Sequence, residues 1–155
     1  MENKINLGDR KTSEKIDRMF DLIDLIYRKL TENEIKVWFN GTFGVSAYYG
    51  YIFDEPRDVD CGVMEKDFDE ARRIIENLGY TNIENKENEK FKVSIYRVND
   101  FNLEIGTFEQ DLGDKIITLE KHELRVPDAK WLAECYRITA QKEEWGKTIN
   151  LEQNF

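Results

Sequence analysis

The spacing of hydrophobic residues changes along this chain, and that change limits the folds it can adopt. Between positions 14 and 30, apolar residues recur every three or four positions, as on one face of a helix. Segments 57–63, 91–98 and 101–108 instead alternate apolar and polar residues, as half-buried strands do. The two patterns are interspersed without a strict strand–helix–strand repeat. This order favours an α+β (mixed α/β) fold, in which a mixed β-sheet is flanked by helices.

Local signals place the other elements. Ser13 is suited to cap the first helix, and the dipeptide Asn99-Asp100 is suited to a tight turn between two strands. Gly79 is a natural stop for the helix before it, and the charged run 84–90 is expected to be an exposed loop. The remaining expected elements are short strands at 35–40, 115–119 and 124–126, and helices at 43–49, at 67–78 and from Pro127-Asp128 onward.

Length and charge bound the organisation and the partners. The chain has 155 residues, so we expect a single domain spanning 1–155. Its formal net charge is −9, which disfavours non-specific binding to nucleic acid or to an anionic membrane, because both need a basic surface. No segment approaches the ~18 consecutive apolar residues of a membrane helix, and the first ten residues are polar. We therefore expect a cytoplasmic protein.

The inventory of reactive side chains excludes several kinds of site. Cys61 and Cys135 are isolated from each other, and His122 is the single histidine. These residues cannot supply the usual ligand set of a zinc ion. A Ser-His-Asp or Cys-His enzyme would depend on His122, and no nucleophile elbow accompanies it.

Two carboxylates on one expected strand are the strongest chemical signal. In 57–63 the two-residue period puts Asp58 and Asp60 on the face opposite Val59 and Cys61. Two aspartates on one face of a strand repel each other, so a positive charge should lie in front of them. The other Asp-x-Asp pair, at 67–69, starts a helix, where acidic residues are favoured on structural grounds.

A third carboxylate and a glycine bend extend this signal. Glu104 faces away from the apolar side of its strand; Asp100 is the rival third carboxylate, although the turn already explains it. Three carboxylates can hold two Mg²⁺ ions ~3.5–4 Å apart, as in phosphoryl or nucleotidyl transfer. Gly41 allows the backbone to approach phosphate oxygens, and amides of the following helix can donate to them.

The stretch from Val37 to Val45, then Gly50, then Arg57-Asp58-Val59-Asp60, resembles the small antibiotic nucleotidyltransferases of the polymerase-beta-like superfamily, especially the lincosamide and aminoglycoside-2''-type enzymes. The resemblance implies a nucleotidyltransferase-like fold. It implies that Asp58, Asp60 and Glu104 are the catalytic, metal-holding residues. It further implies that Gly41 and Thr42 contact a nucleoside triphosphate; Arg57 is a candidate phosphate contact beside the aspartate pair.

The predicted function is therefore metal-dependent transfer of a nucleoside monophosphate, from a triphosphate expected to be ATP, to a hydroxyl group of a small molecule such as a lincosamide or aminoglycoside. Two Mg²⁺ ions are expected as cofactors, and a homodimer with sites near the interface is one way to enclose both substrates. Asp54 and Pro56 stand where these enzymes often carry Arg and His. That departure motivates an alternative, a catalytically inactive domain that binds nucleotide or a partner protein in a toxin-antitoxin or regulatory pair. An acidic interaction module with an incidental Asp pair is a third interpretation.

Overall fold

The computed structural model describes residues 9–138, so the ends of the predicted domain 1–155 lie outside the described residues. Its helices are α1 (Glu14–Glu32), α2 (Gly41–Tyr49), α3 (Phe68–Asn77) and α4 (Ala129–Ile138), with a 3₁₀ turn, η1 (Glu65–Asp67), before α3. Its strands are β1 (Trp38–Phe39), β2 (Val59–Met64), β3 (Thr81–Glu87), β4 (Lys92–Val98), β5 (Phe101–Phe108), β6 (Ile116–Leu119) and β7 (His122–Arg125). The α+β prediction is confirmed.

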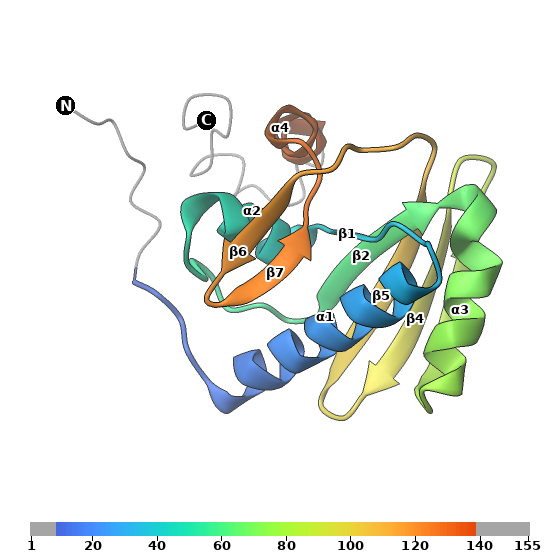
Figure 1. Ribbon diagram of the computed structural model, residues 1–155, viewed down its shortest axis with the longest axis horizontal. Coiled ribbons are helices and arrows are strands. Elements are labelled where there is room, and N and C mark those ends of the chain that lie inside the picture. Colours follow the sequence, from blue (N-terminus) through green and yellow to red (C-terminus); the bar gives the residue numbers. More distant parts are fainter. Residues whose placement is uncertain (1–8, 139–155) are drawn as a thin grey trace.

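Five of the strands form a mixed sheet in the order β1-β2-β5-β4-β3. Strands β2 and β5 are parallel neighbours at its centre, and the other pairs are antiparallel. The β6–β7 hairpin forms a separate two-stranded sheet. Helices α1 and α3 lie against one face of the large sheet (Figure 1). We call this the core face, and the opposite face the site face.

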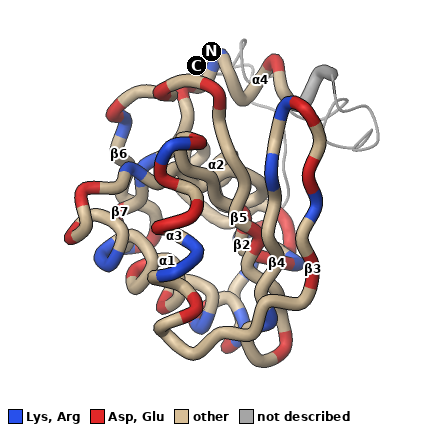
Figure 2. Tube along the Cα trace, turned by 90° about the vertical axis from the view of Figure 1, so that its right-hand side faces the viewer, with Lys and Arg blue, Asp and Glu red and all other residues tan. Residues whose placement is uncertain are grey.

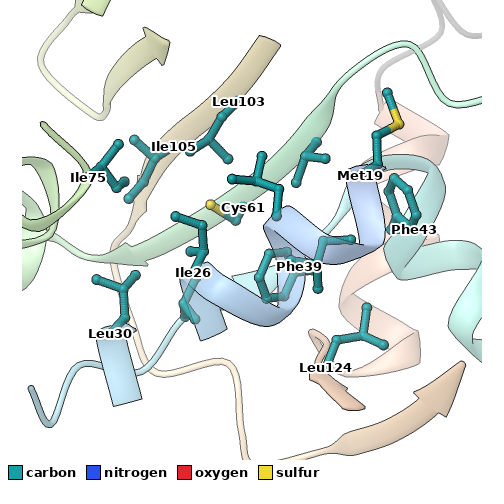
Figure 3. Packing of buried hydrophobic residues seen from close by; sticks show 14 of the residues in the cluster. Met19, Ile26, Leu30, Phe39, Phe43, Cys61, Ile75, Leu103, Ile105 and Leu124 are labelled. Atoms are coloured by element: carbon teal, nitrogen blue, oxygen red, sulfur yellow. The ribbon is translucent and has the colours of Figure 1, made fainter. Parts of the chain in front are cut away.

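Helix α1 forms as its sequence pattern predicts. The Ser13 hydroxyl accepts a hydrogen bond from the Ile16 backbone N–H at 3.1 Å, which caps the first turn. The apolar positions of α1 are buried against the core face, where they meet residues of β2 and β5 (Figure 3). Burial of about 25 cal/mol per Å² of apolar surface makes this layer the main stabilising contribution. The fully buried residues at its centre are Ile23, Ile26, Leu30, Val59, Val63, Leu103 and Ile105.

Several predicted boundaries are wrong in instructive ways. The strand expected at 35–40 is reduced to Trp38–Phe39, and the helix expected at 43–49 begins two residues earlier, at Gly41. The strand expected at 57–63 begins only at Val59. Residues 57 and 58 lie in a bend before it, because pairing with β5 starts at Val59 opposite Leu103. This shift changes the position of Asp58.

The charged run 84–90 is also not simply a loop, because residues up to Glu87 belong to strand β3 at the edge of the sheet. Both of its faces are largely exposed, so no apolar alternation marks it in the sequence. Charged residues of both signs follow one another along it (Figure 2), and the pairing with β4 is irregular between Asn82 and Glu84. Charges and a register shift are features that protect an edge strand from pairing with other chains.

A second, smaller apolar cluster joins α2 to α4. It is formed by Val45, Phe53, Leu132 and Ala133. The Tyr48 hydroxyl donates to the Pro127 carbonyl at 2.7 Å, which fixes the start of α4 beside α2. Within residues 9–138, no helix has the length and apolar character needed to span a membrane.

Candidate active site

The register between β2 and β5 brings two of the predicted carboxylates together. Asp60 is the direct partner of Glu104 in the parallel pair. Their chain neighbours Val59, Cys61, Leu103 and Ile105 all belong to the core cluster, so both carboxylates project from the site face. Adjacent strands lie ~4.8 Å apart, which places these two half-buried acids side by side. Acidic segments of β2 and β5 are adjacent in Figure 2.

Gly41 lies directly against the carboxylate of Asp60. A side-chain carbon at this position would collide with Asp60 Oδ2, and the φ angle of Gly41 is +63°, so glycine is required for two independent reasons. The Asn40 backbone N–H donates to the Asp60 carbonyl at 3.0 Å. The chain therefore passes from β1 to the first turn of α2 across the top of Asp60. The predicted proximity of residues 41 and 60 is present in the structure.

Asp58 is held in a different way from the one its sequence position predicts. Because it precedes β2, Asp58 lies outside the strand that carries Asp60, so the expectation of two aspartates within one strand is wrong. Its Oδ1 atom instead accepts a hydrogen bond from the Asn102 backbone N–H at 3.0 Å. The carboxylate thus continues the β2–β5 pairing by one position beyond the strand. Asp58 is anchored to β5, two residues before Glu104.

The three carboxylates do not by themselves form a closed ligand set. Among the residues that the structure describes, no three His, Cys, Asp or Glu side chains are placed to hold one metal ion together. The donors at this position are all oxygens, however, and two further side-chain oxygens, of Asn40 and Asn102, are buried there without a hydrogen-bond partner. Hard oxygen donors with unused capacity suit Mg²⁺, which binds through one or two carboxylates and retains water. The residues present fit such an ion.

The other predicted ligand-binding residues have separate surroundings. Thr42 is the second residue of α2 and is half-buried. Arg57 is exposed, in the bend before β2, and forms no ion pair within residues 9–138. Asp100, the rival third carboxylate, bonds to Arg18 Nη2 at 2.9 Å and lies in the β4–β5 turn. That contact occupies Asp100 in an ion pair.

The Cys61 thiol is buried near two carboxylates of the site. Burial raises the pKa of this thiol, and the nearby carboxylates of Asp60 and Glu104 raise it further. Both acids therefore act on the same buried sulfur from across the sheet. Cys61 stays a neutral thiol and packs in the core, which is the structural role expected for it.

Two further polar residues lie on the site face, of which sequence reasoning missed Asn102. Asn102 lies between Asp58 and Glu104, and Arg97 of β4 is its partner across the sheet. Arg97 is exposed and forms no ion pair with any other described residue, so it brings a cation to this face. Asn102 lies two residues from Glu104, so strand alternation predicts it on the same face. An asparagine that belongs to no recognised motif, however, gives no chemical signal in the sequence.

Glycines and aromatic rings follow the carboxylates along the same face. Gly62 and Gly106 are direct partners in β2 and β5, two residues beyond the Asp60–Glu104 pair. The Phe108 ring covers Gly62, where a side-chain carbon would collide with it. Phe108 in turn meets the ring of Trp131 of α4 edge-on, with centroids 5.4 Å apart. The aromatic contact connects α4 to the site face.

A pocket of about 490 Å³ lies next to this aromatic contact. Trp131 forms part of its wall, and its other lining residues are Gln110, Asp111, Leu112, Asp128, Lys130 and Glu134. Lys36 Nζ bonds to Asp111 at 2.8 Å, so that acid is already paired. The lining carries three acids, Asp111, Asp128 and Glu134, against the single cation Lys130, so it is net acidic.

The sequence matches a known family over residues 22–143, the one described as Aminoglycoside-2''-adenylyltransferase. The chain belongs to this family. It is therefore a nucleotidyltransferase, as the resemblance implied. No curated protein sequence matches it.

Several solved structures share the fold of this chain. The chain is similar to ANT(2'')-Ia in complex with adenylyl-2''-tobramycin, with 15% identity, a TM-score of 0.68, and coverage of 86% of this chain and 87% of that one. It is similar to the lincosamide antibiotic adenylyltransferase LnuA, lincomycin-bound, with 13% identity, a TM-score of 0.63, and coverage of 95% and 100%. A putative nucleotidyltransferase from Thermotoga maritima gives 15% identity, a TM-score of 0.65, and coverage of 89% and 92%. The predicted nucleotidyltransferase-like fold is confirmed.

Proposed function

We propose that this protein transfers a nucleoside monophosphate from a nucleoside triphosphate, with ATP the expected one, to a hydroxyl group of a small antibiotic in the presence of Mg²⁺. The observation that carries the proposal is the register that places Asp60 beside Glu104, directly under the bend at Gly41. An acidic pair beside the start of a helix suits a reaction in which a cation lies between protein and phosphate.

Each carboxylate has a role that follows from its position. Asp58, Asp60 and Glu104 are the residues that would hold Mg²⁺, and two ions remain the expectation. Bound Mg²⁺ supplies charge neutralisation for the triphosphate and lowers the pKa of the attacking hydroxyl. Asp60 is fixed by Gly41 and by its strand, and Asp58 by the Asn102 N–H. Both are therefore oriented before any ligand arrives.

Glu104 is the residue to which we assign the role of general base. The acceptor oxygen forms a bond to the α-phosphorus while the bond from that phosphorus to the pyrophosphate oxygen breaks, and pyrophosphate leaves with the electron pair. The proton of the acceptor hydroxyl passes to the Glu104 carboxylate. Glu104 is half-buried on the site face, so part of its side chain is open to a substrate.

The phosphate side of the site lies at α2 and β4. The side chain of Asn40 makes no capping hydrogen bond, so the first N–H groups of α2, from Gly41 onward, are not capped by it. The Thr42 hydroxyl can donate to the same phosphates. Arg57 and Arg97 are the exposed cations nearest in sequence or register to Asp58 and Asn102. We assign all four residues to triphosphate binding.

The acceptor side is supported by the relatives and by the acidic pocket. Of the similar structures, one is described as in complex with adenylyl-2''-tobramycin, and the other as a lincosamide antibiotic adenylyltransferase bound to lincomycin. In this chain, the net acidic lining at Asp128 and Glu134, with the Trp131 ring beside it, suits an acceptor that carries an amine. We therefore propose a cationic antibiotic as the acceptor. A homodimer that encloses both substrates stays a prediction.

The test is pyrophosphate release from ATP and Mg²⁺ over a panel of aminoglycosides and lincosamides. We expect release with at least one acceptor from the wild type, and its loss in Asp60→Asn. The matched control is Asp69→Asn, in the other Asp-x-Asp pair, which lies exposed in the first turn of α3 and should keep full activity. Full turnover in Asp60→Asn would refute the assignment.

Pyrophosphate release combined with calorimetry tests the alternative of an inactive binding domain. Asp54 and Pro56, which motivate it, have local roles: Asp54 Oδ1 accepts from the Glu55 N–H at 2.9 Å, and Pro56 is buried. Calorimetry with Mg-ATP that shows binding, without release for any acceptor, would favour the alternative. Release for one acceptor would favour transfer.

A further inference from the structure

Two side-chain oxygens in the site are buried without a hydrogen-bond donor. They are Oδ1 of Asn40 and Oδ1 of Asn102, and neither atom contacts a donor among the described residues. Most buried polar atoms in folded proteins have a partner, because an unpaired one has lost its bonds to water without replacement. Two such atoms in one small region indicate that the partner is a bound group.

The backbone places both carboxamides around the carboxylates. The Asn40 N–H bonds to the Asp60 carbonyl, so Asn40 continues the β1–β2 pairing and lies opposite Asp60. Asn40 is two residues from Trp38, whose ring packs edge-on against the ring of the site-face residue Phe108, with the ring centroids 5.9 Å apart. Asn102 is two residues from Glu104 on β5, and its N–H bonds to Asp58. Both asparagines therefore belong to the site face, Asn40 beside Asp60 directly after the neighbouring strand β1, and Asn102 two residues before Glu104 on the same strand.

The local structure leaves both side chains without another role. Asparagine is a favoured N-cap residue, yet Asn40 occupies the N-cap of α2 without making the capping bond. In Asn102 the structural contact is made by the backbone N–H alone. The carboxamides are thus separable from the contacts that hold the fold.

We propose that the carboxamide oxygens of Asn40 and Asn102 accept hydrogen bonds from the water molecules that a divalent cation retains when the site carboxylates hold it. The inference rests on the proposed function. Mg²⁺ gives up its waters reluctantly, so their protons need acceptors in the protein. Neutral oxygens supply them without adding charge to a site that already holds three carboxylates in a chain of net charge −9. This role explains why two buried acceptors without donors are tolerated.

The experiment uses Mn²⁺ in place of Mg²⁺ with a non-hydrolysable ATP analogue, and measures free Mn²⁺ by electron paramagnetic resonance. Asn102→Leu keeps the backbone N–H to Asp58 but removes the oxygen. We expect its Kd for Mn²⁺ to rise by ~10–100-fold, the usual cost of losing a group that supports a metal through its ligands. Asn102→Asp keeps an acceptor oxygen and should bind Mn²⁺ within ~3-fold of the wild type or more tightly.

The second variant separates this role from its nearest rival. If the Asn102 amide instead donated to a carboxylate, Asn102→Asp would remove the donor and add repulsion, so Mn²⁺ binding would fall as far as in the leucine variant. That result, or wild-type binding in Asn102→Leu, would overturn the inference. The matched control is Asn77→Leu, at an exposed position at the end of α3, where no change is expected.

Failure of the inference and failure of the proposed function give different results. If the wild type releases pyrophosphate but Asn102→Leu binds Mn²⁺ as the wild type does, only the role of the carboxamides is refuted. If the wild type binds no Mn²⁺ with the analogue and releases no pyrophosphate, the proposed function is refuted as well. Thermal unfolding of each variant without metal confirms that the fold is retained.

Discussion

The core face and the site face of the large sheet are formed by the same strands, yet they differ in almost every physical property. On β2, Val59, Cys61 and Val63 are buried against α1 and α3, whereas Asp60 and Gly62 point to the other side. On β5, Leu103 and Ile105 alternate with Glu104 and Gly106 in the same register. The core face is stabilised by burial, and the site face carries charge, glycines and buried oxygens without donors.

This comparison shows how one strand serves stability and chemistry at once. Because side chains alternate, a substitution at residue 103 and one at residue 104 act on different properties of the molecule. The core face holds the strand in register, and the register is what places Asp60 beside Glu104. The predictions below test how far the two faces are independent.

The largest expected effect is on turnover, from a change on the site face. Glu104→Gln keeps the shape of the side chain but removes its basicity. We expect pyrophosphate release to fall by ~10²–10⁴-fold, the usual contribution of a general base. The melting temperature should stay close to that of the wild type. The control is Glu123→Gln, at an exposed position of β7, which should keep full activity.

The neighbouring residue should show the opposite behaviour. Leu103 is completely buried on the core face, and Leu103→Ala should lower the free energy of unfolding by ~2–5 kcal/mol through lost burial and a cavity. Turnover per folded molecule should change little. Denaturant unfolding gives the first quantity, and activity corrected for the folded fraction gives the second. A variant with unchanged stability and lost turnover would mean that the two faces are not independent.

Of the two faces, the core face is the one that the sequence predicts better. Its alternation in 101–108 and its helical spacing in 14–30 are local patterns, and both elements form where those patterns indicate. The same alternation correctly assigned Asp60 and Glu104 to the other face. Their proximity in space, however, follows from the parallel pairing of β2 with β5, which brings together segments more than forty positions apart.

The errors on the site face also have a physical origin. The sequence pattern of Asp58 looks like that of a strand residue, but the ladder begins at Val59, and the Asp58 side chain replaces a backbone partner through the Asn102 N–H. The sequence predicts a loop at 84–90, where the structure has the second half of β3, because an exposed edge strand needs no apolar alternation. Asn40 and Asn102 can be identified as candidate site residues only from the structure, which shows that their side-chain oxygens are buried without a hydrogen-bond donor.

Gly41 offers a way to disturb the site face through the backbone. Gly41→Ala introduces a side chain at φ +63° that would collide with Asp60 Oδ2, so Asp60 or α2 must move. We expect a loss of ~1–3 kcal/mol in stability and a larger loss in turnover. Gly50→Ala is the matched control at the other end of α2, because its φ is +88° but no atom lies within 4 Å. It should share the backbone cost and keep its turnover; equal turnover losses in both variants would contradict the proposed contact.

The smallest expected effect concerns a polar group on the core face. The buried Tyr96 hydroxyl donates to Glu76 Oε2 at 2.7 Å and accepts from Arg72 Nε at 3.2 Å. Tyr96→Phe should lower the free energy of unfolding by ~1 kcal/mol at pH 7, the net value of a typical hydrogen bond. Turnover should not change, because these contacts lie on the face that carries no carboxylate of the site.

The same residue predicts how stability depends on alkaline pH. Burial, followed by the hydrogen bond to Glu76, raises the pKa of Tyr96 to about 12 from the ordinary 10.0. In the unfolded chain the phenol loses its proton near pH 10, whereas in the folded chain it keeps it to a higher pH. The folded state therefore binds more protons between these values, and stability falls as pH rises from 10 to 12. Burial, with the charge of Asp128 adding to it, also raises the pKa of Tyr48 to about 12, so it contributes in the same direction. Urea unfolding across this pH range should show a smaller loss in Tyr96→Phe than in the wild type, and the smallest in the double variant with Tyr48→Phe; a wild type of constant stability over that range would contradict the burial of both phenols.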